Sequence, residues 1–480
     1  MTLSTLLDTS RLTVLRQRLQ ARLTNAPEHG LISITLDLGA RREDWLNADM
    51  RRPDTFYWSH PGNSGHGNER LSDHRLALGR ALFFSTAGMA RFTALQAAFK
   101  GLLPYWQHDD SDHSGIEAAA HLGFAFEDNV QNELPNALLC VPAILLQNRA
   151  QRCTATFSCT VRDAATAVAR WCETLRSASR RRPPGWPPDV PVRKASPLGD
   201  RAFLARAHAA LDDIASGKID KVVLTRKVAF QAAQAIAVAP LLAALADRHA
   251  ECTTYSVAQA SSVFIGATPE RLVSLNNGIV RADALAGTAW LSATSDAAQE
   301  CSLKLHGDKN SREQQMVVDA VRSALAPLCI SLDPPQTPEI MQLRKLQHLR
   351  TRVSGRLRDG VGLFDLIARL HPTPAVGGTP TAAARQWLQA HGEQRAAWYT
   401  GGLGWIDRRG NGEIAVPLRC ANIKGAHAEL FAGAGVVAGS DPYQELAETE
   451  VKLGAMIDAL QHAGPRNDRS TGEIAQTGTH

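Results

Sequence analysis

Residues 430–452 read LFAGAGVVAGSDPYQELAETEVK and contain a predicted strand, a turn and the start of a predicted helix. In the strand, glycine alternates with small residues, so that a ligand or another backbone can approach closely. The turn supplies Asp441 as an N-cap, Pro442 in the first helical turn and Gln444 as a capping-box partner. A strand followed at once by a well-defined helix favours a fold that mixes both kinds of element.

One face of this helix carries two acids and a lysine. Glu445, Glu448 and Lys452 stand at positions i, i+3 and i+7, on a face that continues into Met456. On spacing alone, such a face is more often an exposed salt-bridged surface than a binding site. The glycine-rich strand beside it shifts the balance toward a ligand, and carboxylate oxygens are donors that suit Mg²⁺.

A further carboxylate is aimed at a predicted core. In the helical pattern over residues 310–326, apolar residues recur with helical period, and Glu313 falls on their stripe one turn earlier. A buried, unpaired carboxylate is strongly unfavourable, so Glu313 needs a cation, a hydrogen-bonding partner or a place at the mouth of a cleft. An acid at a helix start that stays solvated is the alternative reading of this residue.

Strands and helices alternate on both sides of these segments. Strand-like runs at 221–228 and 262–265 and a helical pattern at 202–215 predict an α+β fold. Nearer the N-terminus, segments such as 56–58 and 137–146 suggest strands but contain no residues at catalytic spacing.

Two segments of biased composition divide the chain. Residues 176–200 are rich in arginine and proline and predict an exposed linker between an N-terminal α/β portion, 1–175, that packs on the core and a catalytic domain, 201–463. Its three successive arginines are better explained as a solvated loop than as a nucleic-acid patch. The polar residues 464–480 predict a disordered tail.

Bulk composition is that of a globular enzyme. Of 480 residues, 44% are hydrophobic and 21% charged, and the net charge of +5 gives no general reason to expect nucleic acid. Eight cysteines without a CxxC pair favour reduced thiols, and no apolar run has the length of a membrane span. We therefore expect a cytoplasmic protein with neither nucleic acid nor membrane as a partner. The oligomeric state is not readable from the sequence.

Over residues 202–460 the chain resembles the chorismate-utilising enzymes, a family that includes isochorismate, salicylate, anthranilate and aminodeoxychorismate synthases. The resemblance rests on motifs that follow one another in the family's order. These are KVVLTR (221–226), FIGATPERL (264–272), ALAGT (284–288), EQQMVVD (313–319), QHL (347–349), LHPTPAV (370–376), WY (398–399), LR (418–419) and AGAG (432–435), followed by Glu445, Glu448 and Lys452. The resemblance implies a large antiparallel β-sandwich core surrounded by helices, with chorismate bound in a deep cleft.

The resemblance also implies a role for each matched residue. Lys221 would act as a general base on water and Glu270 as a general acid, and Mg²⁺ would be held by Glu313 and Glu448 with help from Glu445. The expected substrate-binding residues are Ala286, Gly287, Thr288, His348, Tyr399, Arg419, Gly433, Ala434, Gly435 and Lys452. Taken singly, several have ordinary structural explanations, such as a core histidine at 348 or a salt-bridged arginine at 419.

Details of the motifs point to isochorismate as the released product. Family members that use ammonia usually carry glutamine where Lys221 stands, so Lys221 indicates water as the nucleophile. Aminodeoxychorismate synthases tend to have lysine where this chain has Ala286, and salicylate synthases often have threonine where it has Ala375. Departures from the family are Gln314 in place of a common histidine and Cys420 in place of a usual serine.

The implied reaction is addition of water at C2 of chorismate with loss of the C4 hydroxyl, giving isochorismate. It requires Lys221 to be buried or to lie near a cation, and Glu270 to stay protonated in an apolar setting. The alternatives are a salicylate synthase that goes on to eliminate pyruvate and a relative that binds chorismate without turnover. Whether the product serves menaquinone, siderophore or salicylate synthesis stays open.

Overall fold

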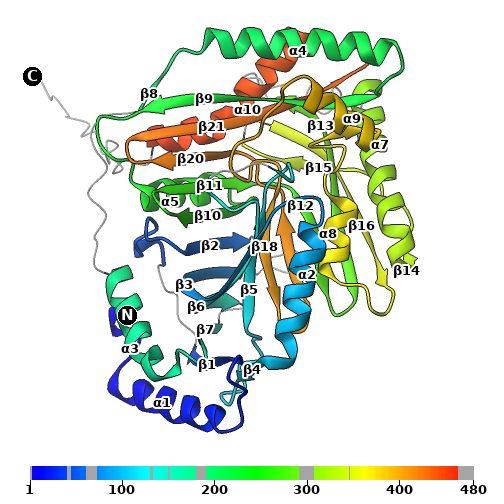
Figure 1. Ribbon diagram of the computed structural model, residues 1–480. Helices are drawn as coiled ribbons and strands as arrows, with labels where there is room; N and C mark the ends of the chain where they lie inside the picture. The colour runs from blue at the N-terminus through cyan, green and yellow to red at the C-terminus, as the bar shows by residue number, and fades with distance from the viewer. Residues whose placement is uncertain are drawn as a thin grey trace, which may run out of the picture.

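The computed structural model describes residues 3–39, 45–60, 73–129, 133–149, 152–179, 191–290, 307–344 and 346–462. Long antiparallel strands form the centre of the molecule and helices cover them (Figure 1). The predicted α+β fold with an antiparallel sandwich core is therefore confirmed.

One layer of strands runs from the N-terminal part of the chain to the strand that begins at Lys221. In order of hydrogen-bonded neighbours it comprises β4 (Trp106–Asp109), β1 (Leu31–Gly39), β7 (Arg152–Thr160), β6 (Ala137–Arg149), β3 (Asp73–Thr86), β2 (Thr55–His60), β10 (Thr253–Gln259), β11 (Ser262–Thr268), β20 (Cys420–Lys424), β21 (His427–Val437) and β9 (Lys221–Gln231). Of these pairs, β1 with β4 is parallel and the others are antiparallel. The short strands β8 (Val192–Arg193) and β17 (Gly378–Thr379) pair with the outer edge of β9.

The second layer branches from β6, which pairs with β7 over residues 144–149 and with β5 over residues 137–140. It comprises β5 (Ala119–Phe124), β18 (Gly402–Asp407), β19 (Gly412–Ala415), β12 (Arg271–Asn276), β13 (Ile279–Trp290) and β16 (Leu346–Leu357), with β14 (Cys329–Leu332) and β15 (Glu339–Gln342) on the far edge of β16. Since β2 pairs with β10 and β5 with β18, the strands of residues 1–175 belong to the same hydrogen-bonded system as those of the predicted catalytic domain.

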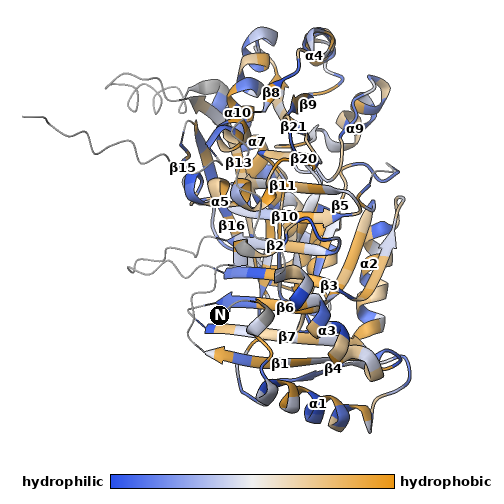
Figure 2. Ribbon diagram, turned by 90° about the vertical axis from the view of Figure 1, so that its left-hand side faces the viewer, coloured by the Kyte–Doolittle hydropathy of each residue, from blue (hydrophilic) through white to orange (hydrophobic). Residues whose placement is uncertain are grey.

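The helices cover the faces of these layers. They are α1 (Thr9–Leu23), α2 (Arg91–Leu102), α3 (Ala164–Ser179), α4 (Pro197–Ala215), α5 (Val238–Arg248), α7 (Asp308–Leu325), α8 (Leu363–Leu370), α9 (Thr381–Ala390) and α10 (Pro442–His462), with single 3₁₀ turns at Leu3–Thr5, Trp45–Asn47, Leu103–Tyr105 and Ala326–Leu328. Helix α10 packs on β21, α4 on β9 and α7 on β13. Figure 2 shows hydrophobic residues along the strands and hydrophilic residues on the exterior of α1.

Helix boundaries follow the local signals in the sequence. Helix α10 starts where the capping pattern predicts: the backbone N–H of Gln444 donates a hydrogen bond of 2.8 Å to Asp441 Oδ1, which makes Asp441 the N-cap. Helices α3 and α4 reach into both ends of the predicted linker at 176–200. Residues 180–190 of that segment and the predicted tail at 464–480 lie outside the described residues.

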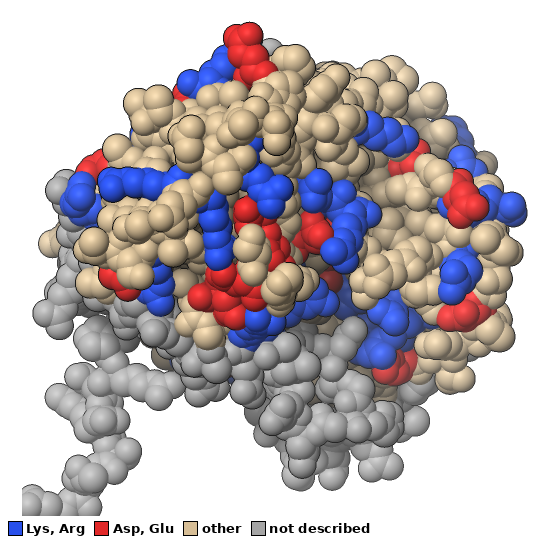
Figure 3. Space-filling view, turned by 90° about the horizontal axis from the view of Figure 1, so that it is seen from below, with Lys and Arg blue, Asp and Glu red and all other residues tan. Residues whose placement is uncertain are grey.

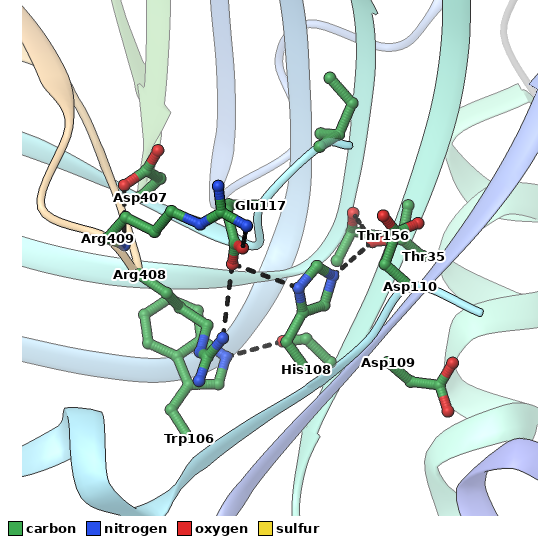
Figure 4. A network of polar contacts seen from close by, with 12 residues as sticks. Thr35, Trp106, His108, Asp109, Asp110, Glu117, Thr156, Asp407, Arg408 and Arg409 are labelled. Carbon is green, nitrogen blue, oxygen red and sulfur yellow. Dashed lines mark hydrogen bonds and ion pairs between the residues drawn. The ribbon is translucent and has the colours of Figure 1, made fainter. Parts of the chain in front are cut away.

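A polar network connects the N-terminal strands to the turn between β18 and β19 (Figure 4). The Glu117 carboxylate lies 3.3 Å from His108 Nδ1 and 2.7 Å from Arg409 Nη2. His108 Nε2 shares a hydrogen bond of 2.8 Å with the Thr35 hydroxyl on β1. Residues from opposite ends of the chain therefore meet around one acid, which fixes the N-terminal strands against the second layer.

The described surface carries both signs of charge. On the face shown in Figure 3, Lys and Arg side chains lie among Asp and Glu side chains. The cysteines in the described ranges all carry free thiols, and Cys301 lies outside those ranges. Within the described residues, no helix combines the length and the apolar character needed to cross a membrane.

Candidate active site

A cavity of about 350 Å³ lies where β9, β21 and β13 meet α7 and α10. Residues from distant parts of the chain converge on it. Of the fifteen residues expected at the site, thirteen line it: Glu270, Ala286, Gly287, Thr288, Glu313, His348, Tyr399, Arg419, Gly433, Gly435, Glu445, Glu448 and Lys452. The sequence motifs, which span more than 180 positions, thus form one site.

Lys221 lies directly behind the wall of this cavity. Its side chain is 1% exposed, and its Nζ is 2.7 Å from Glu313 Oε1. A Cβ atom on Gly435 would stand 2.9 Å from Lys221 Cε and 3.4 Å from both Lys221 Nζ and Glu313 Oε1. The absence of a side chain at Gly435 therefore leaves room for the lysine and for its contact with Glu313.

Ala434 differs from its two glycine neighbours. Successive residues of a strand point to opposite faces, so Gly433 and Gly435 face the cavity while the methyl group of Ala434 does not. That methyl group packs in an apolar cluster with Val222 and Leu224. The structure therefore places the Ala434 side chain away from the cavity, and a contact of this residue with substrate stays a prediction.

The acids of α10 are paired with neighbours. Glu448 Oε1 is 2.6 Å from Lys452 Nζ, and the same amine donates to the Gly433 carbonyl at 2.9 Å. Glu445, one turn earlier, is 3% exposed. The face that spacing alone would assign to solvent is instead turned to the cavity.

Arg419 is oriented by a neutral histidine. His348 Nδ1 is 3.0 Å from the Gly287 carbonyl oxygen, which can only accept, so Nδ1 carries the proton and Nε2 accepts from Arg419 Nη2 at 3.1 Å. Burial and the Arg419 charge lower the pKa of His348 to about 3, which keeps the ring neutral. The guanidinium charge is thus held in place by an uncharged partner and stays available to an anion in the cavity.

Glu270 is a buried acid in the cavity wall. The side chain is 4% exposed. Burial raises the pKa of Glu270 to about 8, although the positive charges of Arg419, Lys221 and Lys452 lower it. The acid is therefore mostly protonated at neutral pH.

A family model described as chorismate binding enzyme matches residues 17–461, nearly the whole chain. The chain belongs to the chorismate-binding enzyme family. The family assignment that the sequence motifs predicted is therefore confirmed.

Relatives of this chorismate-binding enzyme carry consistent names. It is 37% identical over 310 residues to the salicylate biosynthesis isochorismate synthase of Pseudomonas aeruginosa, covering 63% of this chain and 64% of the relative. It is 35% identical over 270 residues to the isochorismate synthase MenF of Bacillus subtilis, covering 56% of this chain and 57% of the relative. The matched region thus spans less than two thirds of each of these proteins.

A solved structure extends the likeness to nearly the whole chain. The menaquinone-specific isochorismate synthase MenF from Escherichia coli superposes with a TM-score of 0.75 at 25% identity, covering 94% of this chain and 100% of that one. Component I of anthranilate synthase from Streptococcus pneumoniae, at 19% identity and a TM-score of 0.65, shares the fold.

The cavity of this chorismate-binding enzyme offers oxygen donors that suit Mg²⁺. In the described ranges, no three His, Cys, Asp or Glu side chains are grouped closely enough to form a metal site made of protein ligands alone. Mg²⁺ usually takes one or two carboxylates and completes its shell with water and substrate oxygens. Glu313 and Glu448, which face the same cavity from two helices, match that demand.

Some lining residues were not foreseen. Those outside the quoted motifs are Ala289, Asn310, Thr400 and Gln444. Asn310 stands three positions before Glu313 on α7, so helical spacing could have placed it on the same face. Gln444 was assigned to the capping box, and Thr400 has no local signal at all.

Proposed function

We propose that this chorismate-binding enzyme is an isochorismate synthase that converts chorismate to isochorismate with Mg²⁺. The observation that carries the proposal is the convergence of the buried Glu270 and of paired acids and cations on one cavity, with Lys221 directly behind its wall. The names of the relatives from Pseudomonas aeruginosa, Bacillus subtilis and Escherichia coli support the same activity.

In the proposed reaction, Lys221 takes a proton from the water that attacks C2 of the ring. The ring double bonds shift, the C4–oxygen bond breaks, and Glu270 gives its proton to the departing hydroxyl, which leaves as water. The product has the composition of the substrate, and later proton exchange restores both side chains. To act as the base, Lys221 must be in its neutral amine form, and its contact with Glu313 must give way to one with the attacking water.

Binding is assigned to the cations and donors on the cavity wall. Chorismate carries two carboxylates, for which Arg419 offers paired donors and Lys452 a point charge. Tyr399 lines the same wall. When bound between Glu313 and Glu448, Mg²⁺ would neutralise the ring carboxylate and make C2 more open to attack.

The test is product analysis of the purified protein with chorismate, with and without Mg²⁺. We expect isochorismate by chromatography, little pyruvate in a coupled assay and loss of turnover in EDTA. A stoichiometric yield of pyruvate would make the protein a salicylate synthase. Thermal stabilisation by chorismate without any product would make it a binding protein.

Two details of cellular context complete the proposal. We place the reaction in the cytoplasm, because the described cysteines are free thiols and most of them are buried. The only partner that the proposal requires is chorismate.

A further inference from the structure

The strand that carries Lys221 has one incompletely covered edge. Strand β21 pairs with β9 along its full length, whereas on the other side β17 pairs only with Lys221 and Val222, and β8 only with Phe230 and Gln231. Next along this edge come the carbonyl of Val223 and the backbone N–H of Thr225. Both residues are buried, so these two groups need hydrogen-bonding partners. Side chains supply them: Arg395 Nη2 donates to the Val223 carbonyl at 2.9 Å, and Glu393 Oε1 accepts from the Thr225 amide at 2.7 Å.

Arg395 holds two further segments together with this strand. Its Nη1 donates to the Val376 carbonyl at 2.6 Å and to the Thr400 hydroxyl at 2.7 Å. The guanidinium is 2% exposed and lies 3.7 Å from the ring centre of Phe126. Val223, Val376 and Thr400 all line the cavity, whereas Arg395 itself does not.

One of these segments is strained. Thr400 has a φ of +58°, in the left-handed region that β-branched residues rarely adopt. Its hydroxyl is held by Arg395, and its carbonyl accepts a hydrogen bond of 3.0 Å from His371 Nε2. The preceding residue, Tyr399, lines the cavity at the proposed carboxylate-binding wall. The contact from Arg395 therefore helps to hold a conformation on which the wall depends.

We infer that Arg395 is a positioning residue for catalysis: it sets the strand of the base, Lys221, relative to the turn at Tyr399 and Thr400 and to the loop at Val376. The inference rests on the proposed function, because it makes Arg395 responsible for the distance between the proposed base, Lys221, and the part of the cavity wall at Tyr399 that is proposed to bind substrate. A planar guanidinium reaches three acceptors at fixed angles, which the single ammonium of lysine cannot reproduce. A displacement of about 1 Å between reacting groups lowers a rate about 10²-fold.

The experiment compares Arg395→Lys and Arg395→Gln with the wild type, using chorismate consumption for rates and chromatography for products. Arg385→Lys is the matched control, because Arg385 is an exposed arginine on the neighbouring helix α9 that forms an ion pair with Asp128. Rates are expressed per folded molecule, from circular dichroism and the melting transition. We expect kcat to fall about 10²-fold in each Arg395 variant that stays folded, with a smaller change in KM. The control should match the wild type.

The possible results separate the inference on Arg395 from the proposed function. A folded Arg395→Lys variant with wild-type kcat per folded molecule would overturn the inference, and so would failure of both Arg395 variants to fold, which would make Arg395 a residue of stability only. A wild type that consumes chorismate but forms another product would overturn the proposed function while leaving the test of Arg395 valid. A wild type that consumes no chorismate would overturn both.

Discussion

Replacing Glu270 by glutamine should abolish turnover and, at the same time, stabilise the folded protein. In the folded state, burial raises the pKa of Glu270 from 4.5 to about 8. A carboxyl whose pKa is raised by folding binds its proton more tightly in the native state than in the unfolded state. The native state is therefore destabilised as pH rises from the unfolded pKa toward the folded one, and the full loss is reached above about 8. Glutamine has nearly the same shape and does not ionise, so it escapes this loss.

The size of the effect follows from the two pKa values of Glu270. At 1.36 kcal/mol per pKa unit, the ionisable side chain costs about 1 kcal/mol at pH 5, about 3 kcal/mol at pH 7 and about 5 kcal/mol at pH 9. The same shift explains the functional need for burial. At pH 7, a carboxyl with an ordinary pKa would be about 0.3% protonated, whereas Glu270 is about 90% protonated.

Urea and thermal unfolding of the wild type and Glu270→Gln, from pH 5 to pH 9, measure this difference. We expect the stability gain of the variant to grow steadily with pH while its isochorismate formation is lost. Glu28→Gln, which removes an exposed carboxylate paired with Arg162, should show no such trend. A gain that is independent of pH, or a variant that becomes less stable at high pH, would refute the assignment of Glu270 as a buried acid.

Three further predictions concern the same site. Because the acid must be protonated, kcat/KM for chorismate should fall about tenfold per unit as pH rises above about 8, and a pH profile without this descending limb would contradict the assignment. Lys221→Gln should lower kcat by about 10²-fold to 10⁴-fold in a protein that remains folded by circular dichroism; normal turnover would show that another group is the base. Gly435→Ala should also lose activity, since its Cβ would meet Lys221 at 2.9 Å, whereas Gly454→Ala on α10, with open space around its Cβ, should keep full activity and melt slightly higher. Equal activities of the two alanine variants would refute the close fit at Gly435.

Local signals in the sequence predicted the elements but not how they meet. The strand with alternating glycines and the capped helix after it were foreseen from residues 430–452, because caps and periodicity act over a few positions. The pairing of β2 with β10 and of β5 with β18 joins segments that are far apart in the sequence. Such pairings depend on tertiary packing, so the N-terminal strands were described only as a portion that packs on the core.

The same distinction applies to the residues of the site. Periodicity alone identified Glu313, Glu445 and Glu448 as candidates. It left an exposed face as the stronger alternative for Glu445 and Glu448, and a solvated acid at a helix start as an equal alternative for Glu313. Their convergence with Lys221 was implied only by the resemblance to a family. Arg395 gave no signal, because a single arginine in a polar loop is typical of a solvated surface; its contacts with three segments exist only after the strands have assembled.

The charges around the cavity suggest why substrate and metal belong together. At pH 7 Glu270 and His348 are mostly neutral, and the remaining charged groups are balanced, with three cations and three acids: Lys221, Arg419, Lys452, Glu313, Glu445 and Glu448. Chorismate brings two negative charges and Mg²⁺ two positive ones, so the pair leaves this balance unchanged. Either one alone leaves two uncompensated charges in a partly buried site, which is unfavourable. We therefore expect each to raise the affinity for the other, as calorimetric titrations of Mg²⁺ and of chorismate into the Glu270→Gln variant would measure, since this variant should bind without turnover and keeps the six charged groups. Affinities that do not depend on the other ligand would mean that the cavity balances its charges by taking up or releasing protons instead.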